Sequence, residues 1–183
     1  MSSDPERPES PALAAAKQIG EDVEDLVIDA VDELAHADED DAHHDAETVA
    51  LLTPSSDDVL QLGSIPLVER GTDVEIKAAL DHTNGANSPR GRWFFKGRDD
   101  GQHAALLDEH AVYLLAVYAE PVDGERELRA AIVVPATVVD ELLAGRWYDS
   151  GRREGAVAKL TWSAVLDPDD IENTHPDAGG DSS

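Results

Sequence analysis

The 183-residue chain contains no cysteine and has few aromatic residues, few basic residues and no long apolar run. Without cysteine, neither a disulfide framework nor a thiolate metal site can form, and thiol catalysis is excluded. No apolar run reaches the roughly 18 residues that a transmembrane helix needs. The N-terminal residues also lack the basic and apolar regions of a signal peptide. We therefore expect a soluble cytoplasmic protein with no membrane partner.

Two kinds of enzyme sequence motif are also missing. There is no Gly-x-Gly-x-x-Gly or Walker loop, which argues against binding of a nucleotide cofactor. There is no Gly-x-Ser-x-Gly elbow, so nothing indicates a serine hydrolase.

Acidic residues are abundant: 40 Asp and Glu stand against 14 Lys and Arg, for a net charge of −26. At ordinary ionic strength this charge opposes compaction and repels nucleic acid. At molar salt the Debye length falls to about 3 Å, and both effects weaken. The composition resembles that of proteins from salt-accumulating halophiles, so the charge reflects the solvent more than a partner. An acidic mimic of nucleic acid is the alternative.

The spacing of apolar residues predicts two helices joined by a loop in the first third of the chain. Apolar residues recur every three or four positions from Pro11 to about Ala37, which predicts an amphipathic helix with an acidic outer face. The acidic run 38–45 should end this helix as a solvated loop, and a short helix is expected at 46–52. His43 and His44 lie in that loop, and solvation is favoured over a transition-metal site because adjacent side chains point in different directions.

The remainder alternates between strand and helix patterns. Strands are expected at 59–62, 65–68, 73–80, 92–96, 112–118, 128–134 and 157–162, and helices at 99–109 and 136–143. This order predicts an α/β protein with a mixed central sheet flanked by helices. The expected domain organisation is a disordered tail at 1–8, a single α/β domain at 9–167 and an acidic disordered tail at 168–183.

A basic island interrupts the acidic chain between residues 70 and 98. It holds three acidic residues and six basic ones: Arg70, Lys77, Arg90, Arg92, Lys96 and Arg98. Within it, Glu75 and Lys77 are two positions apart on an expected strand, so their side chains share one face. A carboxylate beside an ammonium, in a patch that tolerates phosphates, suits metal-assisted phosphodiester chemistry.

This order of elements, with Glu75-x-Lys77 on a strand next to a turn, resembles the PD-(D/E)xK nuclease superfamily. The resemblance covers roughly residues 12–120 and implies a restriction-endonuclease-like αβββαβ core with C-terminal strand and helix additions. It implies Mg²⁺- or Mn²⁺-dependent hydrolysis of DNA in repair, restriction or mobile-element biology. In that case Glu75 would bind the metal and Lys77 would orient the attacking water. The resemblance also allows a homodimer.

The sequence does not fix the second acidic metal ligand. Asp58, which precedes Glu75 by 17 residues, is the first candidate. A hairpin turning near residues 70–71 would instead place Glu75 opposite Pro66, far from Asp58. The alternatives are Asp57, Glu69, Gln61 and an acid of the N-terminal helix.

Further residues are candidates for contacting DNA. They are Arg90, Arg92, Lys96, Arg98, Gln102 and His103. Gln102 and His103 open an expected helix, whose N-terminus attracts anions, although simple capping explains them equally well. Trp93 and Phe95 are expected in the core, which leaves Phe94 on the side of Arg92 and Lys96.

Two readings other than a nuclease stay open. One is a catalytically inactive nuclease-fold module that binds DNA or a protein. The other is an acidic interaction protein without nucleic-acid contact, which basic residues scattered over the surface would favour.

Overall fold

The computed structural model describes residues 11–37, 43–53, 60–65, 67–83, 90–120, 125–151 and 155–172. Its helices are α1 (Pro11–Ala30), α2 (Gln102–Asp108), α3 (Ala136–Leu142) and α4 (Pro168–Glu172), with a 3-10 turn η1 (Trp162–Ala164). Its strands are β1 (Leu34–His36), β2 (Ala46–Thr48), β3 (Leu60–Leu62), β4 (Asp73–Leu80), β5 (Arg92–Lys96), β6 (Val112–Ala119), β7 (Glu127–Pro135), β8 (Tyr148–Asp149) and β9 (Ala156–Thr161).

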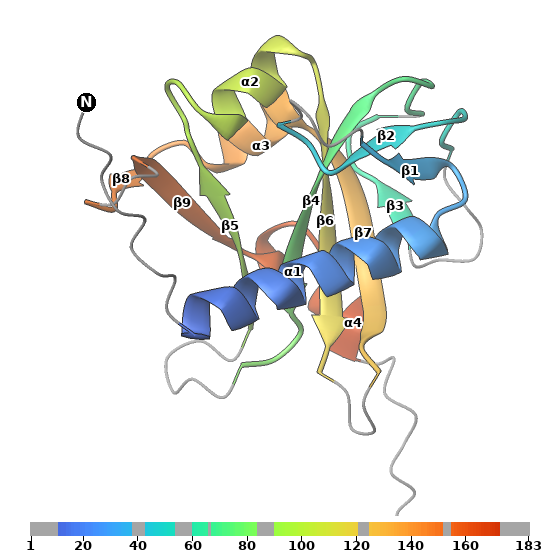
Figure 1. The fold of residues 1–183 in the computed structure, drawn as a ribbon, viewed down its shortest axis with the longest axis horizontal. Helices are drawn as coiled ribbons and strands as arrows, with labels where there is room; N and C mark the ends of the chain where they lie inside the picture. The colour runs from blue at the N-terminus through green and yellow to red at the C-terminus, as the bar shows by residue number, and fades with distance from the viewer. Residues whose placement is uncertain are drawn as a thin grey trace, which may run out of the picture.

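Two sheets organise the molecule. The large sheet has the strand order β1-β2-β4-β6-β7-β3 and is mixed, because β4 runs parallel to β6 while β7 runs antiparallel to it. The small sheet has the order β5-β9-β8 and is antiparallel. In Figure 1, α1 crosses the large sheet, α2 and α3 lie together at one end, and the small sheet lies to the left. The expected mixed α/β architecture is therefore confirmed.

Strand β6 forms the centre of the protein and is buried along its whole length. Its even-numbered residues join the hydrophobic cluster that includes Val23 and Val27 of α1. Its odd-numbered residues join a second cluster with Trp93 and Trp162, both fully buried. This alternation places one core on each face of the sheet, and it explains why β6 reads as continuous apolar sequence.

The largest difference from the sequence prediction lies between residues 31 and 52. Helix α1 ends at Ala30, and the expected short helix at 46–52 is wrong, since β2 occupies 46–48 and pairs antiparallel with β1 and β4. In β2, Ala46 and Thr48 are buried while Glu47 is exposed, as expected for a strand. Short apolar runs are compatible with a helix or a strand, and here pairing with β4 stabilises the strand.

Most later elements agree with the prediction within two or three residues, but β8 was not predicted and two further expectations differ. The expected strand at 65–68 is reduced to a bridge between Leu52 and Val68. Residues 168–172, expected to be disordered, form α4 and bury Ile171. Residues 1–8 and 173–183 lie outside the described residues. Within the described residues, no helix combines the length and the apolar character needed to cross a membrane.

Candidate active site

Glu75 and Lys77 lie next to each other in the middle of the protein. Their neighbours Val74 and Ile76 pack into the core on the α1 side, so strand alternation directs Glu75 and Lys77 to the other face of β4. The Glu75 side chain is only 2 % exposed, and its Oε1 forms an ion pair with the Lys77 ammonium, whose side chain is 17 % exposed. The predicted pair is therefore formed, and it is withdrawn from solvent.

Asp45 lies beside Glu75, at the start of the segment that pairs with β4. The antiparallel register of β2 and β4 pairs Ala46 with Val74, which brings Asp45 level with Glu75. The Asp45 amide donates to the carbonyl of Val74 at 3.1 Å. Its Oδ2 accepts from the amide of Ile76 at 2.9 Å. Asp45 is thus held to the residues on either side of Glu75.

The acids of this region affect one another electrostatically. Burial raises the pKa of Glu75 to about 7; Lys77 opposes this rise, and the negative charges of Asp45 and Glu24 add to it. Burial likewise raises the pKa of Glu24, on α1, to about 7, and Asp45 adds to that rise. The three carboxylates therefore form one electrostatic cluster with a single ammonium, that of Lys77, acting on it.

One member of this cluster, Glu75, has a buried oxygen that a divalent cation could bind. The Oε2 atom of Glu75 is buried and has no hydrogen-bond partner among the described residues. A buried acceptor without a partner is costly, and the mutual repulsion of nearby carboxylates adds to that cost. Hard cations such as Mg²⁺ and Mn²⁺ take oxygen ligands, and one or two carboxylates suffice because the ion keeps several waters. Glu75 and Asp45 are the residues best placed to hold such an ion.

Gln102, at the start of α2, links three segments of the site. Its Oε1 accepts from the Lys77 ammonium at 3.3 Å, and its Nε2 donates to the carbonyl of His43 at 3.1 Å. This side chain therefore contacts the lysine, although the sequence suggested a role in contacting DNA. Its position ties α2 to β4 and to the segment that precedes β2.

The next residue, His103, points into the interior. Its side chain is fully buried, with Nδ1 at 2.8 Å from the Tyr113 hydroxyl and Nε2 at 3.2 Å from Oδ1 of Asp140. Burial lowers the pKa of His103, while the hydrogen bond and charge of Asp140 oppose that effect. This side chain is thus not available at the surface for the expected phosphate contact.

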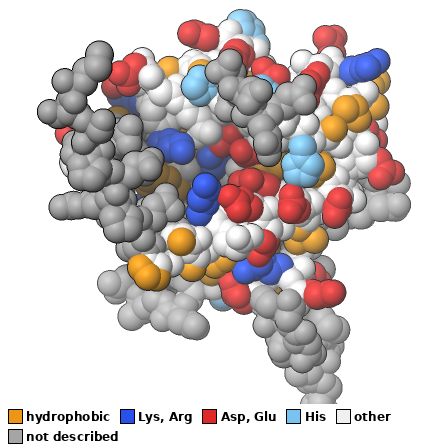
Figure 2. Space-filling model, in the orientation of Figure 1, with side chains coloured by type: hydrophobic (Ala, Val, Ile, Leu, Met, Phe, Trp, Pro, Cys, Tyr) orange, Lys and Arg blue, Asp and Glu red, His pale blue; other side chains and the backbone are white. Residues whose placement is uncertain are grey.

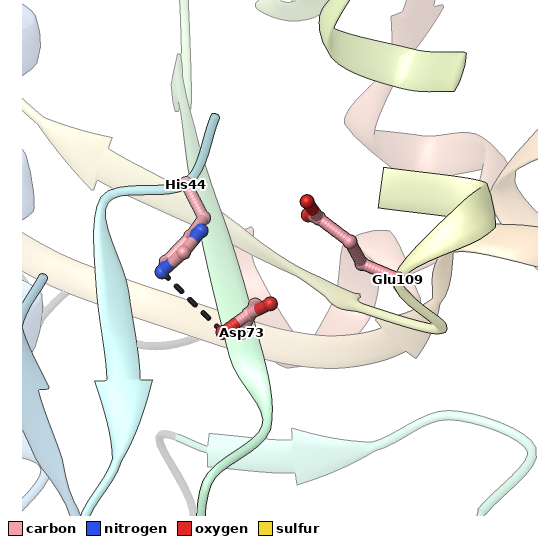
Figure 3. A group of neighbouring side chains, drawn as sticks. All are labelled: His44, Asp73 and Glu109. Carbon is pink, nitrogen blue, oxygen red and sulfur yellow. Dashed lines mark ion pairs between the residues drawn. The ribbon is translucent and has the colours of Figure 1, made fainter. Parts of the chain in front are cut away.

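A second group of side chains that could hold a metal ion lies near the start of β4. His44, Asp73 and Glu109 each offer one ligand atom, and these atoms lie within 4.8 Å of one another (Figure 3). The Nε2 atom of His44 is 3.4 Å from Oδ1 of Asp73. His44 is only 17 % exposed, so the expectation of a solvated loop residue is wrong for it. A nitrogen with two carboxylates suits a transition metal better than Mg²⁺.

The basic residues of the island are mostly exposed. Arg92, Lys96 and Arg98 are exposed, while the Arg90 guanidinium lies 5.3 Å from the centre of the Trp162 ring. Trp93 and Phe95 are buried, and Phe94 is exposed, as expected. On the face drawn in Figure 2, basic side chains gather around a hollow above α1, with acidic side chains beside them.

Of the other candidates for a second acid, Glu69 and Gln61 belong to the part of the chain that the structure describes. Asp57 and Asp58 lie outside the described residues. Glu69 is exposed, and the contact that it makes with β2 is through its backbone carbonyl, which accepts from the Thr48 hydroxyl at 2.6 Å. Gln61 is on β3 at the edge of the sheet, separated from β4 by β6 and β7. An acid of the N-terminal helix was among the alternatives, and Glu24 on α1 acts electrostatically on Glu75.

Sequence reasoning did not pair Asp45 with Glu75, because it placed Asp45 in the acidic loop 38–45 and expected a helix directly after it. The available signal was Ala46-Glu-Thr-Val49, whose small and β-branched residues alternate with a charged one. An acid directly before such a strand could have been recognised as a partner for β4.

A comparison with models of protein families gives a match over most of the chain. Residues 10–167 match the family model of a PD-(D/E)XK nuclease superfamily domain. No curated protein matches the chain significantly. The match includes α1, β2, β4 and α2, which carry Glu24, Glu75, Lys77 and Gln102, and it includes Asp45 just ahead of β2.

Proposed function

Since the chain belongs to the PD-(D/E)XK nuclease superfamily, we propose that it is a metal-dependent nuclease that hydrolyses DNA phosphodiester bonds. The observation that carries this proposal is the buried Glu75–Lys77 pair with Asp45 bonded to the strand on either side of Glu75. An acid, a second acid and a lysine then share one small region of the molecule. Repair, restriction or mobile-element biology would use such an activity.

The proposed ligands of a Mg²⁺ or Mn²⁺ ion are Glu75 and Asp45, with Glu24 close enough to influence both. Asp45 is proposed as the second ligand because it bonds to β4 on either side of Glu75 and its charge acts on Glu75; Asp58 lies outside the described residues. A divalent cation held there would stabilise charge on the phosphate and lower the pKa of a bound water.

Lys77 is proposed to orient the attacking water and to stabilise charge that develops on the phosphate. Its ammonium is a compact positive charge with three donors, so it can keep Glu75 and Gln102 as partners while it donates to a third group. Gln102 restrains that ammonium through its contact at 3.3 Å. A donor fixed before reaction stabilises the transition state without reorganisation.

Arg92, Lys96 and Arg98 are the proposed phosphate contacts, because they are exposed and belong to the basic island. Arg90 is a further candidate from the same basic island, and its guanidinium lies 5.3 Å from the centre of the Trp162 ring. Each such contact releases counterions, so DNA binding should weaken as salt increases.

The test is a plasmid-cleavage assay at high salt with Mg²⁺ or Mn²⁺, comparing the wild type with Glu75→Ala and Lys77→Ala. Both variants should lose cleavage. A matched control is the exposed pair Lys17 and Glu21 on α1, which lie 3.8 Å apart and carry the same two side-chain types. Alanine at either control position should leave cleavage unchanged.

Cleavage that survives Glu75→Ala and Lys77→Ala would overturn the proposed catalytic site. A wild type that binds DNA without cutting it, with either metal, would indicate the inactive nuclease-fold module instead. His44→Ala belongs in the same series, because it separates the group of His44, Asp73 and Glu109 from the Glu75 site: cleavage should persist in this variant.

A further inference from the structure

The small sheet presents one outward face that differs from the rest of the molecule. Along β5, residues 92, 94 and 96 are exposed, while Trp93 and Phe95 are buried. Directly paired residues of antiparallel strands share a face. Because Phe94 pairs with Lys159, and Lys96 and Tyr148 both pair with Val157, strands β9 and β8 extend the same face.

Exposed aromatic side chains are concentrated on this face. The chain has eight aromatic residues by its counts of three Trp, three Tyr and two Phe. Among the exposed large hydrophobic residues, the two aromatic ones are Phe94, which is 39 % exposed, and Tyr148, which is 48 % exposed. Both project from the outward face of the small sheet, so the pattern is not a scatter of single exposed rings.

The charge of this face is the reverse of the charge of the whole chain. Arg92 and Lys96 lie two residues to either side of Phe94, about 7 Å along the strand. The Lys159 ammonium is 6.0 Å from the centre of the Phe94 ring. Asp149 is the acid within these three strands, and it follows Tyr148 directly, so it projects to the opposite face. The outward face within the described strands therefore carries three cations and no acid.

We propose that this face binds an unpaired segment of nucleic acid, with a base stacked on Phe94 and the backbone held by Arg92, Lys96 and Lys159. The proposal rests on the proposed nuclease function and names its substrate class: DNA with a single-stranded region. We refer to Arg92, Phe94, Lys96 and Lys159 as the stacking face.

The chemistry of the stacking face distinguishes an unpaired strand from a duplex. The bases of a duplex are stacked on one another, and a ring on a flat sheet reaches a base only if that base is unstacked. A ring between cations is instead the arrangement that suits single strands, because every base has a face to stack and every nucleotide has a phosphate. Stacking is also less sensitive to salt than phosphate contacts, which weaken steeply as salt increases.

The experiment measures binding of fluorescent oligothymidylate and of a blunt duplex of equal length by anisotropy. The full chain carries Glu75→Gln and the buffer contains EDTA, so that cleavage plays no part. Replacing Phe94 with Leu keeps an apolar side chain and removes the ring. We expect about 10-fold weaker binding of the oligothymidylate, within the range measured for loss of base stacking, and less than a twofold change for the duplex. Phe94→Trp should restore binding.

Leu51→Ala is the matched control, because Leu51 is 52 % exposed and lies away from the small sheet. It should bind both probes like the parent. An unchanged oligothymidylate affinity in Phe94→Leu would overturn the proposal, as would an equal loss for both probes. Plasmid cleavage by the wild type distinguishes the two failures: cleavage with no effect of Phe94→Leu rejects the stacking face and leaves the proposed nuclease function standing.

Discussion

Two buried polar clusters lie side by side on the face of the sheet covered by α2, and they differ in how well their groups are paired. Glu75 and Tyr113 are paired neighbours on β4 and β6. Around Glu75, one carboxylate oxygen has no hydrogen-bond partner in the part of the chain that the structure describes, and burial raises the pKa of Glu75 to about 7. Around Tyr113, the hydroxyl and both nitrogens of His103 have partners.

We interpret this difference in hydrogen-bond pairing as a difference in role: Glu75 is proposed to bind a ligand, and His103 to stabilise the fold. Satisfied buried networks make a packed core rigid, whereas a buried charge without full pairing destabilises the fold. Proteins retain such destabilising groups mainly where function needs them. The Glu75 cluster should therefore control activity, and the His103 cluster should control stability.

The largest effect is expected from Glu75→Gln, which removes the charge and keeps the shape. DNA cleavage should fall by about 10³-fold, the scale seen when a preorganised electrostatic group is removed. The free energy of unfolding should stay the same or increase, because a poorly paired buried charge is lost. Plasmid cleavage and urea unfolding of the same preparation measure the two effects.

A Glu75→Gln variant that loses both activity and stability would contradict this comparison, since Glu75 would then be a structural residue. Glu21→Gln on the exposed face of α1 is the matched control and should change neither quantity.

His103→Ala should give the converse result. It removes the partner of the buried Tyr113 hydroxyl and leaves space beside Trp147, whose ring lies 5.2 Å from that of His103. The loss of buried hydrogen bonds and the cavity together should lower the free energy of unfolding by about 3 kcal/mol. At a temperature where the variant is folded, cleavage per folded molecule should remain within a few-fold of wild type. Cleavage reduced as strongly as in Glu75→Gln would refute the assignment of His103 to structure.

Gln102 lies between the two clusters, and its substitution should have an intermediate effect. Gln102→Ala removes a restraint on Lys77 without removing the ammonium. Since small misplacements of catalytic groups reduce rates by up to about 10²-fold, cleavage should fall by about 10-fold. Binding of the duplex probe should be unchanged. If Gln102→Ala instead weakens duplex binding and leaves the turnover of bound DNA unchanged, Gln102 contacts DNA as the sequence suggested.

Much of this fold follows from the sequence, because the long strands carry clear patterns. The aromatic run at 92–96 and the continuous apolar run at 112–118 predict strands, the second of them central, and both form. Residues 46–48 could not be assigned in this way. Three residues carry too little pattern, and their conformation depends on pairing with β4, which begins 25 residues later.

The residues of the candidate site divide in the same way, into those that the local pattern places and those that long-range contacts place. Glu75 and Lys77 are near in sequence, so strand alternation alone places them together. Asp45 joins them through pairing between strands distant in the sequence, and Gln102 through the packing of α2. His103 was a candidate for contacting DNA because it opens a helix whose N-terminus attracts anions; Tyr113 and Asp140, which contact its buried side chain, come from β6 and α3.

The smallest effect expected is a dependence of stability on pH that arises from His103. Burial lowers its pKa below the ordinary value of 6.5, so below pH 6.5 the unfolded chain takes up a proton that the folded chain does not. This contribution to stability is therefore fully present above pH 6.5 and is lost as the pH falls toward the lowered pKa. The raised pKa of Glu75 acts in the opposite direction between pH 4.5 and about 7, so the wild-type curve alone does not isolate the histidine.

The measurement is urea unfolding from pH 5 to 8 for the wild type and His103→Gln, with His110→Gln as the control at an exposed histidine. The advantage of wild type over His103→Gln should shrink as the pH falls below 6.5. An advantage that is constant, or that grows toward low pH, would mean that His103 is charged in the folded protein.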